Sequence, residues 1–426
     1  MNLVQKVLAF ASLGLALASC ANNKYKPNET GYNRSRVLEK QSNSYVKIVA
    51  ANDKLTIHDP QKSEDRTKEV IINENIPNKN LSKTEPATKN KSRIFLDEDI
   101  GYFSYHKYRR LQWYLDLAKI SEPNSKERKR LSDIIVAVLD TGVAFENAQR
   151  NGKRYGLSHD LRKTKFVRGY DFINNDPYPN DDNQHGTFMT SVIAADGGII
   201  GVAPGVKIMP VKVLGSNVIG TEEALISGIR YAVDHEANII NLSLNFPKDY
   251  EPNLLLRETI NRGLSMGVVF VAAAGNDSGN YITYPANFPG IISVGATRLR
   301  KNNYNQDFKN VIAGGYSNFT NNLSILAPGG ALDQDVNEDY HPDGILAMTL
   351  DFYNPNRFAY WFQSGTSPAA AIVSGCVARL LAAGSTPDIV YKDLISGSEN
   401  YIDGIPFLNL AESLRNIKVR QALTNR

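Results

Sequence analysis

The chain has 426 residues, of which 42% are hydrophobic and 22% charged, a composition typical of a globular protein with one large domain and a smaller segment. Its net charge of +4 is weak over this length and does not indicate a nucleic-acid partner. The two cysteines, Cys20 and Cys376, exclude a disulfide framework.

Residues 1–19 are typical of an export signal. Lys6 is their only charged side chain, and the apolar run over residues 7–18 is too short to span a bilayer. The run ends in Leu17-Ala18-Ser19-Cys20, which resembles the lipobox of bacterial lipoproteins. The resemblance implies that Cys20 is acylated and anchors the protein in the cell envelope, on the outer membrane or cell surface, facing the periplasm or the exterior. The alternative is an ordinary secretory signal with a chance cysteine.

Residues 20–95 are expected to be a polar linker or a short pro-segment. Residues 78–92 are rich in Asn, Lys, Ser and Thr and poor in apolar side chains, so they cannot bury enough surface to fold alone. Residues 45–50 and 54–57 alternate in polarity, which predicts a short hairpin between them.

Residues 96–420 are expected to form one α/β domain with a largely parallel sheet, because apolar runs of strand length alternate with helical patterns. The run over residues 134–139 is continuous and β-branched, as in a strand buried on both faces. It is followed by Asp140, at the carboxyl end of the strand, where catalytic groups gather in such sheets. Taken alone, an aspartate there is also typical of a turn.

Two further polar residues begin apolar helical runs. His185 precedes the run that ends near residue 195, and Ser367 precedes a long run that ends near residue 381. Each alone is typical of a structural histidine or a helix-capping serine. Together with Asp140 they supply a nucleophile, a base with a pKa near neutrality, and a carboxylate that fixes the base. The order Asp, His, Ser along the chain is that of subtilisin and differs from chymotrypsin and the α/β-hydrolases.

The segments VAVLDTGV, HGT and SGTSPAAA resemble the three catalytic motifs of the subtilisin-like serine proteases, the peptidase S8 family. Other segments, among them GVAPGVKIMPVKVL and VVFVAAAGN, follow in the family's order, so that the resemblance covers roughly residues 105–415. It implies a three-layer α/β fold with a mostly parallel central sheet flanked by helices. It also implies a serine endopeptidase that hydrolyses peptide bonds through an acyl-enzyme.

The same resemblance implies a role for each site residue. Asp140 orients His185, His185 acts as general base and then acid, and Ser367 is the nucleophile. Asn276 matches the family's oxyanion-binding asparagine. Pro368 stands where the family usually has methionine. It is compatible with catalysis, because the oxyanion donor is the N–H of Ser367 itself and proline suits the first turn of a helix.

Substrate contacts are implied for the positions that match the family's binding strands: Ser243, Leu244, Asn245, Ala274, Gly275 and Thr283. Asn245, Phe246 and Thr283 stand where glycines are common. We therefore expect them to narrow or reshape the pocket for the residue before the cleaved bond, which favours small or medium apolar residues there. Phe188, after the histidine motif, is expected near the cleft.

We expect no required cofactor and no tight metal site. The segment over residues 196–201 is shorter than the calcium loop of many relatives and carries one carboxylate, whereas calcium takes six to eight oxygen ligands. A weak calcium site at Asp181-Asp182-Asn183 is one hypothesis, and a solvated turn is the other. The expected partners are protein or peptide substrates and the membrane, and the expected state is a monomer.

Two other classes of protein compete with this interpretation. An esterase of α/β-hydrolase type needs a donor N–H on the residue after the serine, and proline has none. A non-catalytic binding lipoprotein on the same scaffold would not need four chemically competent residues. Cys376 lies in an apolar run and is expected to be a buried small residue.

Overall fold

The computed structural model describes residues 48–50, 93–94, 106–150, 152–300, 311–398 and 401–424. The expected export signal, Cys20 and most of the segment up to residue 95 lie outside these ranges. No helix within them is long and apolar enough to cross a bilayer.

The centre of the fold is a nine-stranded sheet with the spatial order β14-β13-β12-β10-β3-β8-β6, in which β15 also pairs with β13 and β7 with β8. The pairing of β13 with β14 is antiparallel, and the other pairings are parallel. This confirms the predicted α/β fold with a mostly parallel sheet. The strands are β3 Ile135–Asp140, β6 Lys165–Phe166, β7 Tyr170–Asp171, β8 Lys207–Lys212, β10 Ile239–Leu242, β12 Val269–Ala273, β13 Ile292–Leu299, β14 Val311–Ala313 and β15 Ile325–Pro328.

Strand β3 shows how one apolar run supplies two cores. Val136 and Val138 belong to a first hydrophobic core, whereas Ala137 and Leu139 belong to a second one. Successive side chains of a strand point to opposite faces, so a continuous apolar run is what a strand covered on both sides requires. The strand ends on Asp140 itself.

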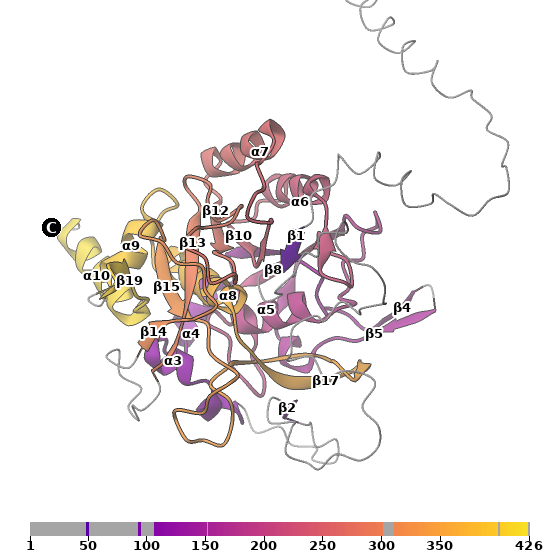
Figure 1. Ribbon diagram of the computed structural model, residues 1–426, viewed down its shortest axis with the longest axis horizontal. Helices are drawn as coiled ribbons and strands as arrows, with labels where there is room; N and C mark the ends of the chain where they lie inside the picture. Colours follow the sequence, from indigo (N-terminus) through magenta and orange to yellow (C-terminus); the bar gives the residue numbers. More distant parts are fainter. Residues whose placement is uncertain are drawn as a thin grey trace, which may run out of the picture. The chain divides into compact units, whose positions relative to one another are not determined.

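Helices cover both faces of the sheet and make three layers, with α6 and α7 together at the top of Figure 1. Side chains of α5 and α8 pack into the first core, and side chains of α6 and α7 pack into the second. The helices are α3 Trp113–Leu117, α4 Ser125–Leu131, α5 His185–Ala194, α6 Glu222–Asp234, α7 Leu254–Ser265, α8 Thr366–Ala382, α9 Val390–Ser396 and α10 Leu410–Thr424, with short 3₁₀ helices η2 Arg109–Leu111 and η3 His159–Leu161.

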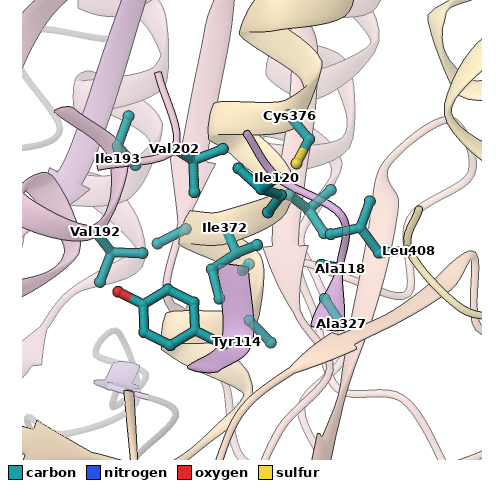
Figure 2. Close-up of a cluster of buried hydrophobic side chains, with 14 of the residues drawn as sticks. Tyr114, Ala118, Ile120, Val192, Ile193, Val202, Ala327, Ile372, Cys376 and Leu408 are labelled. Atoms are coloured by element: carbon teal, nitrogen blue, oxygen red, sulfur yellow. The ribbon is translucent and has the colours of Figure 1, made fainter. Parts of the chain in front are cut away.

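The first core is closed by residues far apart in the sequence (Figure 2). Tyr114 and Ile120 precede the sheet, Ile372 lies on α8, and Leu408 precedes α10. Cys376 lies in the same cluster and is fully buried. Burial raises the pKa of its thiol to about 12, so the thiol is neutral at physiological pH. The interpretation of Cys376 as a buried small residue is confirmed.

Smaller antiparallel sheets surround this framework. One has the order β16-β17-β2 and two others are the pairs β4-β5 and β18-β19. These strands are β2 Arg93–Ile94, β4 Ala148–Arg150, β5 Lys153–Tyr155, β16 Ile345–Asp351, β17 Asn354–Gln363, β18 Tyr401–Ile402 and β19 Ile405–Pro406.

A further three-stranded sheet has the order β11-β1-β9. Its middle strand is β1 Ile48–Ala50, which pairs antiparallel with β11 Leu244–Asn245 on one side and β9 Ile219–Gly220 on the other. The predicted hairpin between residues 45–50 and 54–57 is therefore wrong for its first arm, because both edges of β1 are paired with strands of the large domain. The second arm lies outside the described residues.

Candidate active site

Four of the predicted site residues lie at the carboxyl edge of the sheet. Asp140 is the last residue of β3, and Asn276 lies on the loop that follows β12. His185 is the first residue of α5 and Ser367 is the second residue of α8. Parallel strands end at one edge, so residues more than two hundred positions apart converge there.

Asp140 and His185 form a buried pair. The imidazole Nδ1 lies 2.8 Å from Asp140 Oδ1 and 2.9 Å from Oδ2, and the carboxylate is 0% exposed. The backbone N–H of Thr141 also donates to Oδ1, at 2.7 Å. A carboxylate held in this way favours the tautomer with the proton on Nδ1, which directs Nε2 to proton transfer.

Ser367 is joined to Ser243, the residue between β10 and β11. Its hydroxyl donates to the carbonyl oxygen of Ser243 at 3.2 Å, and the hydroxyl of Ser243 donates back to the carbonyl oxygen of Ser367 at 3.0 Å. The N–H of Ser367 lies in the first turn of α8, where helical N–H groups have no intrahelical acceptor. That N–H is therefore suited to bind an oxyanion.

Asn276 presents a buried donor. Its Oδ1 accepts from the N–H and the hydroxyl of Thr366, each at 3.0 Å. Its Nδ2 is buried and has no hydrogen-bond partner among the described residues. Native structures leave few buried polar groups unpaired, and an unpaired donor next to a nucleophile is what an oxyanion site presents before substrate binds. Thr366 was not singled out by the sequence, although it is part of the serine motif.

Asp181 connects the end of β3, which carries Asp140, with the start of α5, which carries His185. One oxygen accepts from the hydroxyl of Thr141 at 2.9 Å, and the other accepts from the N–H and hydroxyl of Thr187 at 2.9 and 2.6 Å. The first oxygen also caps the turn before α5, through the N–H groups of Asn183 and Gln184. Burial raises the pKa of the Asp181 carboxyl, and these hydrogen bonds oppose that shift.

The proposed calcium cluster is used for other contacts. Besides Asp181, Asp182 pairs with the ammonium of Lys212 at 2.7 Å, and Asn183 donates to the carbonyl oxygen of Ser216 at 2.9 Å. Oxygens of Asp181 and Asp182 are thus engaged within the protein, and the weak calcium site at these residues stays a hypothesis. In the part of the chain that the structure describes, no three His, Cys, Asp or Glu side chains are placed to hold a metal ion.

Lys212 was missed by the sequence reasoning. It ends β8 opposite Asp140, and its ammonium donates to the carbonyl oxygens of Thr141 at 2.6 Å and Leu214 at 3.0 Å. Its side chain is almost fully buried. The signal that could have identified it is a lysine within the apolar run over residues 208–214. Burying a charge is costly unless it is paired, so such a lysine indicates a buried polar contact.

The predicted substrate-binding residues lie on adjacent segments. Leu244 and Asn245 form β11, and Ser243 precedes it. Thr283 donates to the carbonyl oxygen of Ala274 through its N–H at 3.2 Å and its hydroxyl at 3.0 Å. A Cβ on Gly275 would lie 2.9 Å from the Thr283 hydroxyl oxygen, and the φ of +106° also requires glycine there.

Two aromatic residues lie elsewhere than predicted. Phe246 is fully buried in the second core and stacks on Tyr250, with ring centroids 3.8 Å apart. Phe188 is fully buried in the first core. Phe246 was expected to shape the pocket because it stands where glycine is common in the family, and Phe188 was expected near the cleft because it follows the histidine motif. The backbone directs both large apolar side chains into the cores, where burial is most favourable.

A buried Asp–His pair, a serine at a helix start and an unpaired amide at the carboxyl edge of a parallel sheet are the arrangement of serine hydrolases with the chain order Asp, His, Ser. Residues 132–393, more than half of the chain, match the model of the subtilase family, Peptidase S8. The chain belongs to the subtilase family.

Individual relatives agree with this assignment. Subtilisin DY of Bacillus licheniformis is 30% identical over 257 residues, covering 59% of this chain and 77% of subtilisin DY. An alkaline protease of Alkalihalobacillus alcalophilus is 29% identical over 331 residues, covering 76% of each chain. A solved structure of a protease from Pseudoalteromonas arctica PAMC 21717 has a TM-score of 0.57 at 25% identity, covering 72% of this chain and 98% of that one. The chain is a subtilisin-like serine protease.

Proposed function

We propose that this chain is a lipid-anchored endopeptidase of the cell envelope that cleaves peptide bonds with Asp140, His185 and Ser367. The observation that carries the endopeptidase assignment is the sheet β11-β1-β9, in which a segment of the chain lies extended between two strands. Extended peptides are held by strand addition of this kind. Ser243 joins β11 directly to Ser367, so a peptide bound along β11 passes the nucleophile.

The chemistry follows from the four site residues. The hydroxyl oxygen of Ser367 attacks the peptide carbonyl carbon while His185 takes the hydroxyl proton and Asp140 stabilises the imidazolium. The oxyanion is bound by the amide of Asn276 and the N–H of Ser367. His185 then gives the proton to the leaving amine, the C–N bond breaks, and water activated by His185 hydrolyses the acyl-enzyme. Before substrate binds, the Ser367 hydroxyl donates to Ser243, and rotation about its Cα–Cβ bond turns it toward His185.

Active-site labelling tests this assignment. A fluorophosphonate reacts with a serine activated by a base, so it should modify Ser367, and mass spectrometry of the peptides should place the label there. A non-catalytic binding protein would stay unlabelled.

The proposed localisation depends on Cys20. A mature chain starting at Cys20 with a diacylglyceryl thioether and an amide-linked acyl chain meets the need for more than one acyl chain in stable anchoring. We propose that the protein acts as a monomer at the outer membrane or cell surface, on protein or peptide substrates, without nucleic acid and without a required cofactor.

Replacing Cys20 by serine should move the protein from the detergent phase to the aqueous phase in a two-phase extraction, because an oxygen at this position is not acylated. Intact-mass measurement should find acyl chains on the wild type only. Cys376→Ser is the matched control and should still partition with detergent. A wild-type protein that is soluble and begins at a residue other than 20 would contradict the anchor.

We also propose that part of residues 20–95 is a pro-segment that competes with substrate. Strand β1 uses both of its edges, with Val49 opposite Asn245 on one side and Ile219 on the other. A substrate added along β11 needs the same hydrogen-bonding groups, so the two cannot bind together. The tether keeps the segment at a high effective concentration near the groove.

Val49→Pro should therefore lower the KM for a peptide substrate, by on the order of 10-fold, with little change in kcat. Proline removes an N–H and is not tolerated in the middle strand of a sheet. The measurement is steady-state hydrolysis of a chromogenic peptide by the full chain. Asn80→Pro, in the polar stretch, controls for adding a proline, and equal KM values in all three proteins would show that β1 does not compete.

A further inference from the structure

The loop over residues 274–279, which we call the oxyanion loop, carries Asn276 between β12 and Thr283. Contacts of Asn276 itself fix only one end of its amide, through Thr366. Its Nδ2 has no partner among the described residues, so its position depends on the backbone of the loop. An oxyanion donor must be held in place before the charge develops, because preorganisation is the source of its effect.

One fully buried side chain holds this backbone from inside. Asn318 is 0% exposed, and the oxyanion loop wraps around it. Its Oδ1 accepts from the N–H of Asp277 at 3.0 Å and of Gly279 at 2.9 Å. Its Nδ2 donates to the carbonyl oxygen of Ala274 at 3.2 Å and to the carboxylate of Asp277 at 3.3 Å.

These contacts use the whole capacity of the Asn318 amide, which has two N–H donors and two acceptor lone pairs. Its backbone N–H adds a fifth bond, to the carbonyl oxygen of Gly275 at 2.9 Å. Gly275 and the Asn318 side chain approach closely, since a Cβ on Gly275 would lie 2.4 Å from Asn318 Nδ2. Contacts of Asn318 therefore fall on residues 274, 275, 277 and 279, on both sides of Asn276.

We propose that Asn318 is a positioning residue for catalysis, which acts through Asn276 by holding the oxyanion loop so that its unpaired amide faces the developing oxyanion. The proposal rests on the oxyanion role proposed for Asn276. In this arrangement the Asn318 amide uses all of its hydrogen bonds on the loop, and the Nδ2 of Asn276 is left available for the oxyanion. Loss of this support would lower kcat and leave ground-state binding largely unchanged, because the oxyanion forms only on the way to the transition state.

A double-mutant cycle tests this assignment with a chromogenic peptide and the full chain. Asn276→Ala should lower kcat by roughly 100- to 1,000-fold, the range that subtilisin shows for this donor. Asn318→Ala should lower kcat by roughly 10- to 100-fold, since a misplacement of about 1 Å has effects of this size. In the Asn276→Ala background, Asn318→Ala should lower kcat by less than about 2-fold, because the group through which it acts is already gone.

Asn238→Ala is the matched control. The side-chain oxygen of Asn238 accepts from the N–H of Ile135 at 2.8 Å, at the opposite end of the strands. It should lower the melting temperature without lowering kcat. If Asn318→Ala does not fold, Asn318→Asp replaces it, since it keeps the Oδ1 acceptor, loses the donor to Ala274 and adds charge beside Asp277. The same loss of effect in the Asn276→Ala background is expected.

Two results would overturn the inference. The first is an equal fold-loss from Asn318→Ala, or from Asn318→Asp, in both backgrounds, which would mean that Asn318 acts independently of Asn276. The second is an unchanged kcat in a folded Asn318 variant. Failure of the proposed function is distinguishable, because in that case Asn276→Ala alone would leave kcat unchanged.

Discussion

Ser367→Ala should lower kcat by on the order of 10⁶, the loss that subtilisin shows when its nucleophile is removed. Alanine at this position has no hydroxyl to attack the peptide carbonyl, so no acyl-enzyme can form. Ser367 is fully buried, but the change deletes a single oxygen and should leave the fold intact. The measurement is peptide hydrolysis under substrate saturation, together with thermal unfolding of both proteins.

Ser413→Ala provides the comparison. Ser413 is also fully buried in a helix, and its hydroxyl donates to the carbonyl oxygen of Leu394 at 2.9 Å. It should cost about 1 kcal/mol of stability and leave kcat unchanged. Equal turnover by wild type and Ser367→Ala would refute the assignment of the nucleophile.

Asp140→Asn should lower kcat by on the order of 10⁴, as the same change does in other serine proteases with this triad. The Nδ1 of His185 lies 2.8 and 2.9 Å from the two carboxylate oxygens of Asp140. An amide presents an N–H to Nδ1, which favours the tautomer with its proton on Nε2. The imidazole then cannot accept the proton of Ser367, although the shape of the site is preserved.

Asp160→Asn tests whether loss of any buried carboxylate has this effect. Asp160 is buried and accepts from the N–H groups of Gly198 and Ile199 and from the hydroxyl of Tyr360. Its replacement should lower stability but not turnover. If Asp160→Asn reduced kcat as much as Asp140→Asn, the effect would be structural and the orienting role of Asp140 would be wrong.

Much of the fold followed from the sequence because it depends on local pattern. The apolar run before Asp140 predicted a strand buried on both faces, and β3 supplies side chains to both cores. His185 and Ser367 were recognised from their motifs taken together with Asp140, and the apolar runs after them are helices, α5 starting at His185 and α8 one residue before Ser367. The hairpin predicted over residues 45–57 was wrong for its first arm, and the observed pairing was not predictable, because the partners of Ile48–Ala50 lie about 170 and 195 residues further along the chain.

The sequence by itself determined the family, the residues that match its catalytic motifs and the apolar pattern that builds the sheet, because side-chain chemistry and spacing are local properties. The tertiary structure alone decided which polar groups support those residues. Asp181 caps the turn before α5, Lys212 is buried opposite Asp140, and Asn318 lies inside the oxyanion loop. A buried polar group is retained only where partners satisfy it. Those partners come from segments that meet only when the sheet and its helices have assembled.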